Sequence, residues 1–315
     1  MNFSIVGFGH IGKVHKAAIE QVANAKLISI VDVVPNMDDT GVLQYASLED
    51  FLKKDKNTDV VCLATPNGLH AQQAIQCLQA GKHVIVEKPM ALHVADAQKI
   101  LDAADTAGKR VFSFLQLRFS PAVRFVKKLM DENKLGKIYL INIQCYWNRN
   151  ENYYKSRSWS GSREMDGGVL FTQFSHFIDV VDYWMNGIKC ISSQTFNFNH
   201  PYTEFPDSGT ILFTAGNAAG SLMFTTATFN KNYESSITVI AEKGTVKVGD
   251  QYLNEIKYAD ITENSTLENI STEQKAFHAN AVADAICAIE TNQPSIIDGK
   301  NTLGLIRFIE DAYAE

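Results

Sequence analysis

Three closely spaced glycines near the start of the chain constrain its fold more than any other feature. Gly7, Gly9 and Gly12 follow the apolar run 3–6, and a helical pattern begins directly after them. This order predicts a buried strand, a tight turn and a helix in unbroken succession. Glycines at this spacing also occur by chance in ordinary strand-to-helix turns, so the surrounding sequence has to decide their meaning.

The segment that follows favours a dinucleotide-binding turn. A second apolar run, 27–31, ends at Asp32, where a carboxylate can accept hydrogen bonds from both hydroxyls of an adenosine ribose. In such a turn Gly7 makes the bend, Gly9 lets the backbone approach a pyrophosphate, and Gly12 lets the helix pack closely on the strand. The pyrophosphate would lie at the helix N-terminus, whose N–H groups attract an anion. Asp32 would repel a 2′-phosphate and no arginine follows to bind one, so we predict NAD rather than NADP.

Strand and helix patterns alternate through the first third of the chain. Continuous apolar runs predict strands that are buried on both faces, as in a parallel sheet covered by helices. The predicted strands are 58–64, 83–86 and 110–115, and the predicted helices between them are 69–80 and 94–107. We therefore predict the α/β fold class, with a Rossmann doubly wound parallel sheet over residues 1–118 as the NAD-binding domain.

The pattern changes after residue 118. A long alternating segment, 138–146, predicts a strand with one exposed face, and 188–248 holds several more alternating segments separated by Pro, Gly and Asn. Helical patterns cover 121–132, 169–185, 272–290 and 301–313. We predict that 119–315 forms an α+β domain with a large, mostly antiparallel open sheet for substrate binding and oligomerisation. Its last helices are free to pack back on the first domain.

Composition excludes several classes of partner. Of the 315 residues, 29 are Lys or Arg and 35 are Asp or Glu, and the net charge of −6 argues against a nucleic-acid partner. The 5 cysteines are widely spaced and form no C-x-x-C pair, which predicts a reducing compartment and no metal site. The first strand starts at the N-terminus, leaving no room for a signal peptide, and no apolar run is long enough to span a bilayer. We expect a cytoplasmic protein without membrane contact.

A lysine at a strand end is the first candidate for chemistry. Lys88 follows the strand 83–86 and Glu87, at the sheet edge where ligands bind in such folds. Buried lysines are rare and need a reason, although an ammonium that reaches solvent beside Glu87 would be an ordinary alternative. Pro89 restricts the backbone after the lysine and is a candidate for a cis bond.

A histidine in the second predicted domain is the other candidate. His176 lies on the predicted helix 169–185, with Thr172 four residues before it and Asp179 three residues after it on the same face. A hydroxyl and a carboxylate at these positions can orient the imidazole for proton transfer. A lone helical histidine is more often a core residue, so that alternative stays open. The chain has no G-x-S-x-G segment, so acyl transfer has no support.

Taken together, these motifs resemble the Gfo/Idh/MocA oxidoreductases, a family named for glucose–fructose oxidoreductase and inositol dehydrogenase. The matching segments are 7–12, 64–70, 87–89 and 166–179, and the resemblance covers essentially the whole chain. It implies that Lys88 is the active-site lysine and His176 the acid/base. With the glycine turn, it predicts contacts to NAD from Gly7, Phe8, Gly9, His10, Ile11, Gly12, Asp32, Thr65, Pro66, Asn67, His70, Glu87, Lys88 and Gln116.

One departure from the family narrows the expected substrate. Many sugar and inositol dehydrogenases of the family carry Asp where this chain has Thr172. Members that oxidise C3 of UDP-N-acetylglucosaminuronic acid, for bacterial lipopolysaccharide and other surface polysaccharides, also lack that Asp. They look similar to this chain over 116–122 and 146–168 as well. The resemblance thus implies a nucleotide-sugar substrate and a homo-oligomer, a dimer or a tetramer.

The segment 146–163 mixes aromatic and basic residues, which suit an anionic nucleotide-sugar. An exposed loop between domains or subunits is the ordinary alternative for such a segment. The residues predicted to contact substrate are Lys88, Arg118, Tyr146, Asn148, Arg149, Tyr153, Arg157, Trp159, Arg163, Asp166, Thr172, Gln173 and His176.

The expected reaction is hydride transfer from C3 of the sugar to the nicotinamide, with His176 as base and Lys88 stabilising the alkoxide. Three other functions stay open. They are another sugar or inositol dehydrogenase, an NAD-dependent glycoside hydrolase that returns NAD unchanged, and a non-catalytic NAD-binding regulator.

Overall fold

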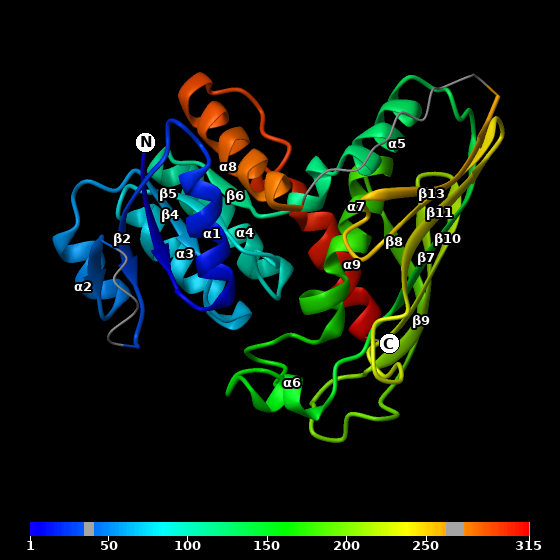
Figure 1. Cartoon of the computed structure of the whole chain (residues 1–315), viewed down its shortest axis with the longest axis horizontal. Helices are drawn as coiled ribbons and strands as arrows, with labels where there is room; N and C mark the ends of the chain where they lie inside the picture. The colour runs from blue at the N-terminus through cyan, green and yellow to red at the C-terminus, as the bar shows by residue number, and fades with distance from the viewer. Residues whose placement is uncertain (35–40, 263–273, 315) are drawn as a thin grey trace. The chain divides into compact units, whose positions relative to one another are not determined.

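The computed structural model describes residues 1–34, 41–262 and 274–314. The chain divides into two compact units, drawn in Figure 1. The first unit consists of Met1–Gln116 and Lys275–Leu303, and the second of Leu117–Gln274 and Gly304–Glu315. The domain boundary predicted after residue 118 lies two residues beyond the boundary of the first unit at Gln116. The segment 275–303 also belongs to the first unit.

A six-stranded sheet organises the first unit, in the order β3-β2-β1-β4-β5-β6, and every pairing in it is parallel. The strand order reverses between β1 and β4, which is the topological switch point of a doubly wound sheet. The α/β prediction with a Rossmann sheet is therefore confirmed. The strands are β1 (Asn2–Val6), β2 (Lys26–Val31), β3 (Leu43–Tyr45), β4 (Val60–Leu63), β5 (His83–Val86) and β6 (Val111–Ser113).

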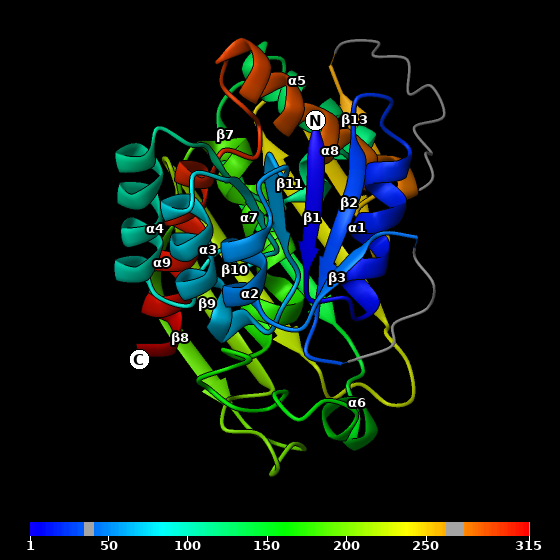
Figure 2. The same cartoon turned by 90° about the vertical axis from the view of Figure 1, so that its left-hand side faces the viewer.

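Helices cover both faces of this sheet, with α3 and α4 on one side and α1 on the other (Figure 2). This is why its central strands are continuous apolar runs: all four residues of β4 are fully buried. The helices are α1 (His10–Glu20), α2 (Leu48–Lys54), α3 (His70–Gln79) and α4 (Val94–Ala107), and a 3-10 turn η1 (Asn67–Leu69) precedes α3.

Strand β3 was not predicted, because the alternation of patterns gives no strand between β2 and α2. It pairs with β2 in parallel, and Asp32 N donates to Tyr45 O over 3.0 Å at the end of the pairing. Three residues, two of them exposed, are too few to show a periodic pattern in the sequence.

The segment 275–303 closes the β6 edge of the first unit. It holds most of α8 (Gln274–Thr291) and the 3-10 turn η4 (Gly299–Thr302), whereas the predicted helix start at 272 lies outside the described residues. Ser113 N donates to Ile297 O over 2.9 Å, and the guanidinium of Arg110 binds the Asp298 carboxylate at 2.8 Å. These contacts satisfy backbone groups that an open sheet edge would expose.

A seven-stranded sheet organises the second unit, in the order β13-β12-β11-β7-β10-β9-β8. All its pairings are antiparallel except that of β10 with β7, which is parallel. The prediction of a mostly antiparallel open sheet is confirmed. Its strands are β7 (Ile138–Tyr146), β8 (Lys189–Phe196), β9 (Ser208–Ala215), β10 (Ala218–Thr225), β11 (Glu234–Ala241), β12 (Gly244–Gly249) and β13 (Glu255–Ile261).

Helices α7 (Ser175–Met185) and α9 (Leu303–Ala314) lie against one face of this sheet, together with α5 (Pro121–Asp131) (Figure 1). Phe213 of β9, for example, packs edge-on against Phe308 of α9, with ring centroids 5.8 Å apart. The opposite face carries apolar side chains that remain exposed, among them Leu140, Ile191, Leu212, Met223 and Tyr258. Among the described residues, no helix is both long and apolar enough to cross a membrane.

Candidate functional site

The glycine turn after β1 has the shape that a diphosphate requires. Gly7 has φ +88°, and a Cβ there would lie 2.7 Å from Ala64 O. A Cβ on Gly12 would lie 2.3 Å from Gly7 O, so only glycine lets α1 pack this closely. A Cβ on Gly9 would meet nothing within 4 Å, and Gly9, His10 and Ile11 are exposed. The turn therefore leaves open space in front of the N-terminus of α1, where an anion is favoured.

Asp32 lies at the end of β2 and is tied to the same turn. Its Oδ2 accepts a hydrogen bond from Phe8 N at 2.6 Å, and its Oδ1 accepts one from Val34 N at 2.9 Å. Each carboxylate oxygen has a second lone pair available for a ribose hydroxyl. The structure thus fits NAD at the position predicted from the sequence.

A turn after β4 carries Thr65, Pro66 and Asn67. Thr65 is fixed by its hydroxyl, which donates to Gln73 Oε1 over 2.6 Å, and Asn67 is largely buried in η1. This places the turn at the C-terminal end of a strand beside the switch point, where ligands bind in this kind of sheet.

The ring of His70, a residue predicted to contact NAD, has two partners within the protein. Its side chain is fully buried, with Nδ1 2.7 Å from Pro89 O and Nε2 2.9 Å from Thr65 O. Burial lowers the pKa of His70, and the two carbonyl acceptors oppose this shift because only the protonated ring can donate to both. His70 therefore links two turns of the protein, and its contact with NAD stays a prediction.

Glu87 also has a partner that the sequence analysis missed. Its Oε1 lies 2.8 Å from Nε2 of the fully buried His15, and its Oε2 accepts from Lys88 N at 3.1 Å. The Glu87 carboxylate is thus part of a buried ion pair, and the contact between Glu87 and NAD stays a prediction. Lys88 is half-buried and the Lys88–Pro89 bond is cis, as the sequence suggested.

Gln116, at the end of the first unit, offers a free acceptor. The side chain is 8% exposed, and its Oε1 is buried with no hydrogen-bond partner among the described residues. An orphaned buried acceptor costs free energy unless a ligand donates to it. An N–H group of a bound cofactor would satisfy Gln116, which fits its predicted place at NAD.

In the second unit, Arg118 forms a buried ion pair that the sequence did not predict. It is 2% exposed, and its Nε and Nη2 lie 3.0 and 2.6 Å from the two carboxylate oxygens of Asp179. The guanidinium also lies over the Tyr183 ring, 5.1 Å from its centroid. This bidentate pair neutralises the charge of Arg118 inside the unit, and the contact of Arg118 with substrate stays a prediction. The sequence had suggested that the Asp179 carboxylate orients His176, whereas in the structure both of its oxygens bind Arg118.

The helix that carries His176 begins irregularly. Residues 170–174 form a π-helical turn, η3 (Leu170–Phe174), and the regular helix α7 starts only at Ser175. Thr172 Oγ1 donates to the buried Asp166 carboxylate and lies 2.8 Å from Gly168 O. The helix predicted over 169–185 is present without a break, but its first turn is π-helical, since hydroxyl bonds of this kind compete with regular helix geometry.

The aromatic and basic segment forms a ladder of alternating rings and guanidinium groups. Arg149 lies between the rings of Trp147 and Tyr153, at 4.7 and 5.0 Å from their centroids. Arg157 lies 5.5 Å from the Tyr153 centroid and 5.7 Å from that of Trp159. Stacking holds the two cations side by side despite their repulsion. A short helix, α6 (Glu151–Lys155), supplies the middle of the ladder.

Gln173 connects the ladder to the start of α7. Its Nε2 donates to the Tyr153 hydroxyl over 2.9 Å. The Gln173 side chain is 4% exposed, and its Oε1 is buried without a hydrogen-bond partner among the described residues. Like Gln116 in the first unit, Gln173 therefore has an acceptor that a ligand hydroxyl could satisfy.

The buried side chain of His200 binds the backbone of the ladder at Arg149, a contact that the sequence did not predict. His200 Nε2 binds Arg149 O, and His200 Nδ1 lies 2.8 Å from the Asp207 carboxylate. Burial is outweighed at Asp207 by hydrogen bonds from His200, Ser208 and nearby backbone, which lower its pKa to about 2. His200 is 51 positions from Arg149 and 7 positions from Asp207 in the sequence. No local pattern could therefore reveal these two contacts.

Three other residues predicted to contact substrate, Arg163, Tyr146 and Asn148, also bind groups of the protein. Arg163 Nε donates to Glu204 O over 2.6 Å, and Tyr146 stacks on Tyr233 with ring centroids 6.4 Å apart. Asn148 donates from its side chain to Thr228 O. These three side chains thus have partners within the protein.

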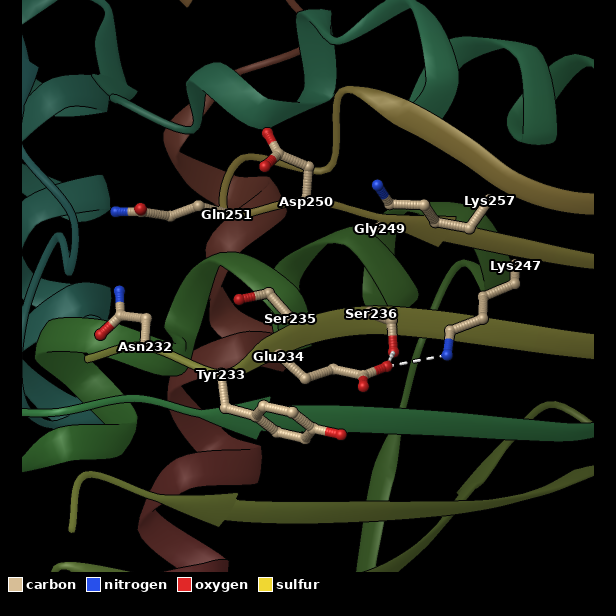
Figure 3. Close-up of a pocket in the computed structure, with 10 residues that line it drawn as sticks. All are labelled: Asn232, Tyr233, Glu234, Ser235, Ser236, Lys247, Gly249, Asp250, Gln251 and Lys257. Atoms are coloured by element: carbon tan, nitrogen blue, oxygen red, sulfur yellow. Dashed lines mark hydrogen bonds and ion pairs between the residues drawn. The ribbon is translucent and has the colours of Figure 1, made fainter. Parts of the chain in front are cut away.

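A pocket of about 500 Å³ is lined by residues of β11, β12 and β13 and of the turns beside these strands (Figure 3). Tyr233, Glu234, Lys247 and Asp250 are among its lining residues, and Glu234 and Lys247 form an ion pair of 2.8 Å. Asn232, at the pocket rim, accepts from Arg149 Nη1 at 3.2 Å. None of the predicted site residues lines this pocket, and the described residues hold no cluster of three metal-ligating side chains.

Comparison with known proteins agrees with the geometry of the first unit. Residues 1–114 match the oxidoreductase family with an NAD-binding Rossmann fold, so the prediction of NAD as cofactor is confirmed. Residues 123–247 match the GFO/IDH/MocA C-terminal domain. The chain belongs to the GFO/IDH/MocA family, as its motifs indicated.

Among similar solved structures are two WlbA dehydrogenases, each in complex with NADH and UDP-GlcNAcA. The protein from Bordetella pertussis is 31% identical, with a TM-score of 0.92 over 99% of this chain and 95% of that one. The protein from Chromobacterium violaceum is 32% identical, with a TM-score of 0.91 over 100% of this chain and 93% of that one.

A curated relative, 2,7-anhydro-N-acetylneuraminate hydratase of Escherichia coli, is 28% identical over 68% of this chain. The match spans 57% of the relative's own length, a little over half.

Proposed function

We propose that this protein oxidises a secondary alcohol of an acidic nucleotide-sugar with NAD, and that C3 of UDP-N-acetylglucosaminuronic acid is the reacting position. The observation that carries the proposal is the ladder of Arg149 and Arg157 between aromatic rings in the second unit. Cations stacked on rings suit a substrate that has carboxylate, diphosphate and base groups. Two solved relatives at 31% and 32% identity were crystallised with UDP-GlcNAcA, which supports this choice.

The roles of the residues follow from the needs of alcohol oxidation. When bound, NAD supplies the hydride acceptor. The alcohol proton must leave as hydride departs, and we assign His176 as the base that accepts it. Lys88 stabilises the negative charge that develops on the alcohol oxygen. The proposal requires both side chains to act on the same hydroxyl.

The buried acceptors define what holds the ligands. Gln116 Oε1 and the Asp32 carboxylate would bind NAD, while Gln173 Oε1 would accept a hydrogen bond from a sugar hydroxyl. The two glutamine oxygens would then gain the partner that a buried polar atom needs. Arg149 and Arg157 would bind the acidic groups of the substrate.

The test is to follow NADH formation with UDP-N-acetylglucosaminuronate, UDP-N-acetylglucosamine and inositol as candidate substrates. We expect turnover with the uronate and at least a tenfold lower kcat/KM for the sugar that lacks the carboxylate, about 1.4 kcal/mol of transition-state binding. Equal activity with both nucleotide-sugars would remove the carboxylate from the proposal. Activity with inositol alone would replace the substrate class.

A second candidate is a reaction in which NAD is reduced only transiently. The match to a hydratase from Escherichia coli favours it, because adding water needs no net oxidation. In that case the substrate would be consumed while NADH does not accumulate. Product analysis by mass spectrometry with one equivalent of NAD separates the two reactions: the proposed oxidation stops after one turnover, whereas the second candidate continues.

The cellular setting is part of the same proposal: synthesis of a bacterial surface polysaccharide such as lipopolysaccharide, in the cytoplasm. We also propose a homo-oligomer in which the exposed sheet face is covered, since Leu212 and Met223 are about half exposed on neighbouring strands. Sedimentation of wild type and Leu212→Glu tests this: the variant should sediment as a smaller species. A monomeric wild type would rule it out.

A further inference from the structure

A buried ion pair between His15 and Glu87 contacts the backbone of Lys88, the proposed catalytic lysine. The Glu87 carboxylate binds Nε2 of His15 through one oxygen at 2.8 Å and accepts from the Lys88 backbone N–H through the other at 3.1 Å. The backbone bond fixes the peptide unit that carries the Lys88 side chain. A carboxylate in this buried position needs a cationic partner, because an isolated charge there would be expensive.

His15 is held in place from several sides. It comes from α1, one turn after Gly12, and its side chain is fully buried. Its ring packs on Phe114, with centroids 4.4 Å apart, and Phe114 in turn lies 5.5 Å from His278 of α8. A ring packed in this way cannot move to a new partner without opening the core.

Charge keeps the pair together. Burial disfavours the charged form of His15, but the Cys62 thiol and the Glu87 carboxylate outweigh it and raise the pKa of His15. Burial likewise raises the pKa of Glu87, and the opposing effect of His15, Lys88 and His278 is larger, so this pKa is lowered overall. The titratable groups that interact with the pair are thus Cys62 from β4, His70 from α3, His278 from α8 and Lys88 itself.

We propose that His15 is a positioning residue for Lys88: it holds the Glu87 carboxylate, and Glu87 fixes the backbone and the charge around the lysine. The inference rests on the proposed function, in which Lys88 is catalytic. It extends that function because His15 lies on the helix that follows the NAD-binding glycines. The same helix therefore serves both cofactor binding and the placement of the lysine.

The experiment compares His15→Gln and Glu87→Gln with His83→Gln. His83 is a matched control on the same strand, β5, whose ring accepts from Arg110 N at 3.0 Å without touching Glu87. The first measurement is the pH dependence of Lys88 labelling by an amine reagent, read by mass spectrometry. In Glu87→Gln, which removes the negative charge beside Lys88, the pH midpoint of Lys88 labelling should be about one unit lower than in wild type. His15→Gln should shift it in the same direction, because a buried carboxylate without a cation becomes protonated.

The second measurement is steady-state kinetics. We expect kcat to fall about tenfold to a hundredfold in both variants, as for a reacting group displaced by about 1 Å. The Kd for NAD should stay within about twofold, since neither side chain is exposed at the glycine turn. A purely structural ion pair would lower the melting temperature without changing the labelling midpoint or kcat.

The double variant His15→Gln/Glu87→Gln buries no charge and keeps the inference testable if His15→Gln does not fold. Wild-type labelling and kcat in a folded double variant, or in both single variants, would overturn the inference. The labelling readout needs no substrate. A shifted midpoint in a protein that oxidises none of the candidate sugars would therefore refute the proposed function while leaving the positioning role of His15 intact.

Discussion

The candidate residues of the two units are held in place in different ways. In the first unit the predicted site residues follow strand ends and glycines, and backbone groups hold several of them, as Phe8 N holds the Asp32 carboxylate. In the second unit the site residues lie on a loop and on an irregular helix start. They are fixed by side chains from distant segments, as Arg149 is through His200. Under the proposed function, cofactor binding would depend on backbone shape and substrate binding on a side-chain network, so variants in the two units should affect different constants.

The largest effect is expected from Lys88→Ala. Without the ammonium, the alkoxide that forms during oxidation has no cation beside it, and kcat should fall about a thousandfold or more. The Kd for NAD, measured by fluorescence, should change little because the glycine turn and Asp32 are untouched. A Lys88→Ala protein with substantial turnover would remove the lysine from the mechanism.

His176→Asn should come next. The variant keeps a polar side chain of similar size but cannot accept the alcohol proton, so kcat should fall about a hundredfold or more. The informative measurement is the pH–rate profile, which should lose its limb near neutral pH. If that limb persists in the variant, another group is the base.

Arg157→Ala should have a smaller effect that falls on substrate binding. Its guanidinium lies between Tyr153 and Trp159, and its removal should raise KM for the nucleotide-sugar about tenfold with little change in kcat. Lys155→Ala is a matched control, because the Lys155 ammonium is already bound by Glu151 at 2.9 Å. Equal KM values for the two variants would mean that the ladder does not bind substrate.

The smallest effect is expected from Asp182→Asn, and on stability rather than activity. Burial and the charge of Asp179 raise the pKa of Asp182 to about 7. The folded state therefore binds more protons than the unfolded state between about pH 4 and pH 7, so wild-type stability falls as pH rises through this range. Asparagine does not titrate, and melting temperatures of the variant should show a flatter pH dependence. An unchanged slope would contradict the assignment.

Much of the first unit was predictable because its signals are local. The turn at Gly7, Gly9 and Gly12, the acid at the end of β2 and the lysine after β5 each lie within a few residues of an apolar strand. The parallel sheet followed from these runs. Its β3 strand did not, because three mostly exposed residues give no pattern.

The side-chain partners could not be predicted in the same way. His15 and Glu87 are 72 residues apart, and Arg118 and Asp179 are 61 apart, so only the fold shows that they form ion pairs. Contacts of Glu87 and His70 with NAD and of Arg118 with substrate were expected from the resemblance to the family, which does not show the partners that these side chains have. Burial demands that such groups find partners within the protein.

The order of segments in the two units has a practical consequence. Residues 275–303 complete the first unit through the bonds of Ser113 and Arg110, while 304–315 return to the second. Neither unit is one continuous piece of chain, so a fragment that ends at residue 118 would lack the segment that covers its β6 edge. Expressing either half alone calls for a circularly permuted or internally fused design, in which the C-terminal piece is rejoined to the half it completes.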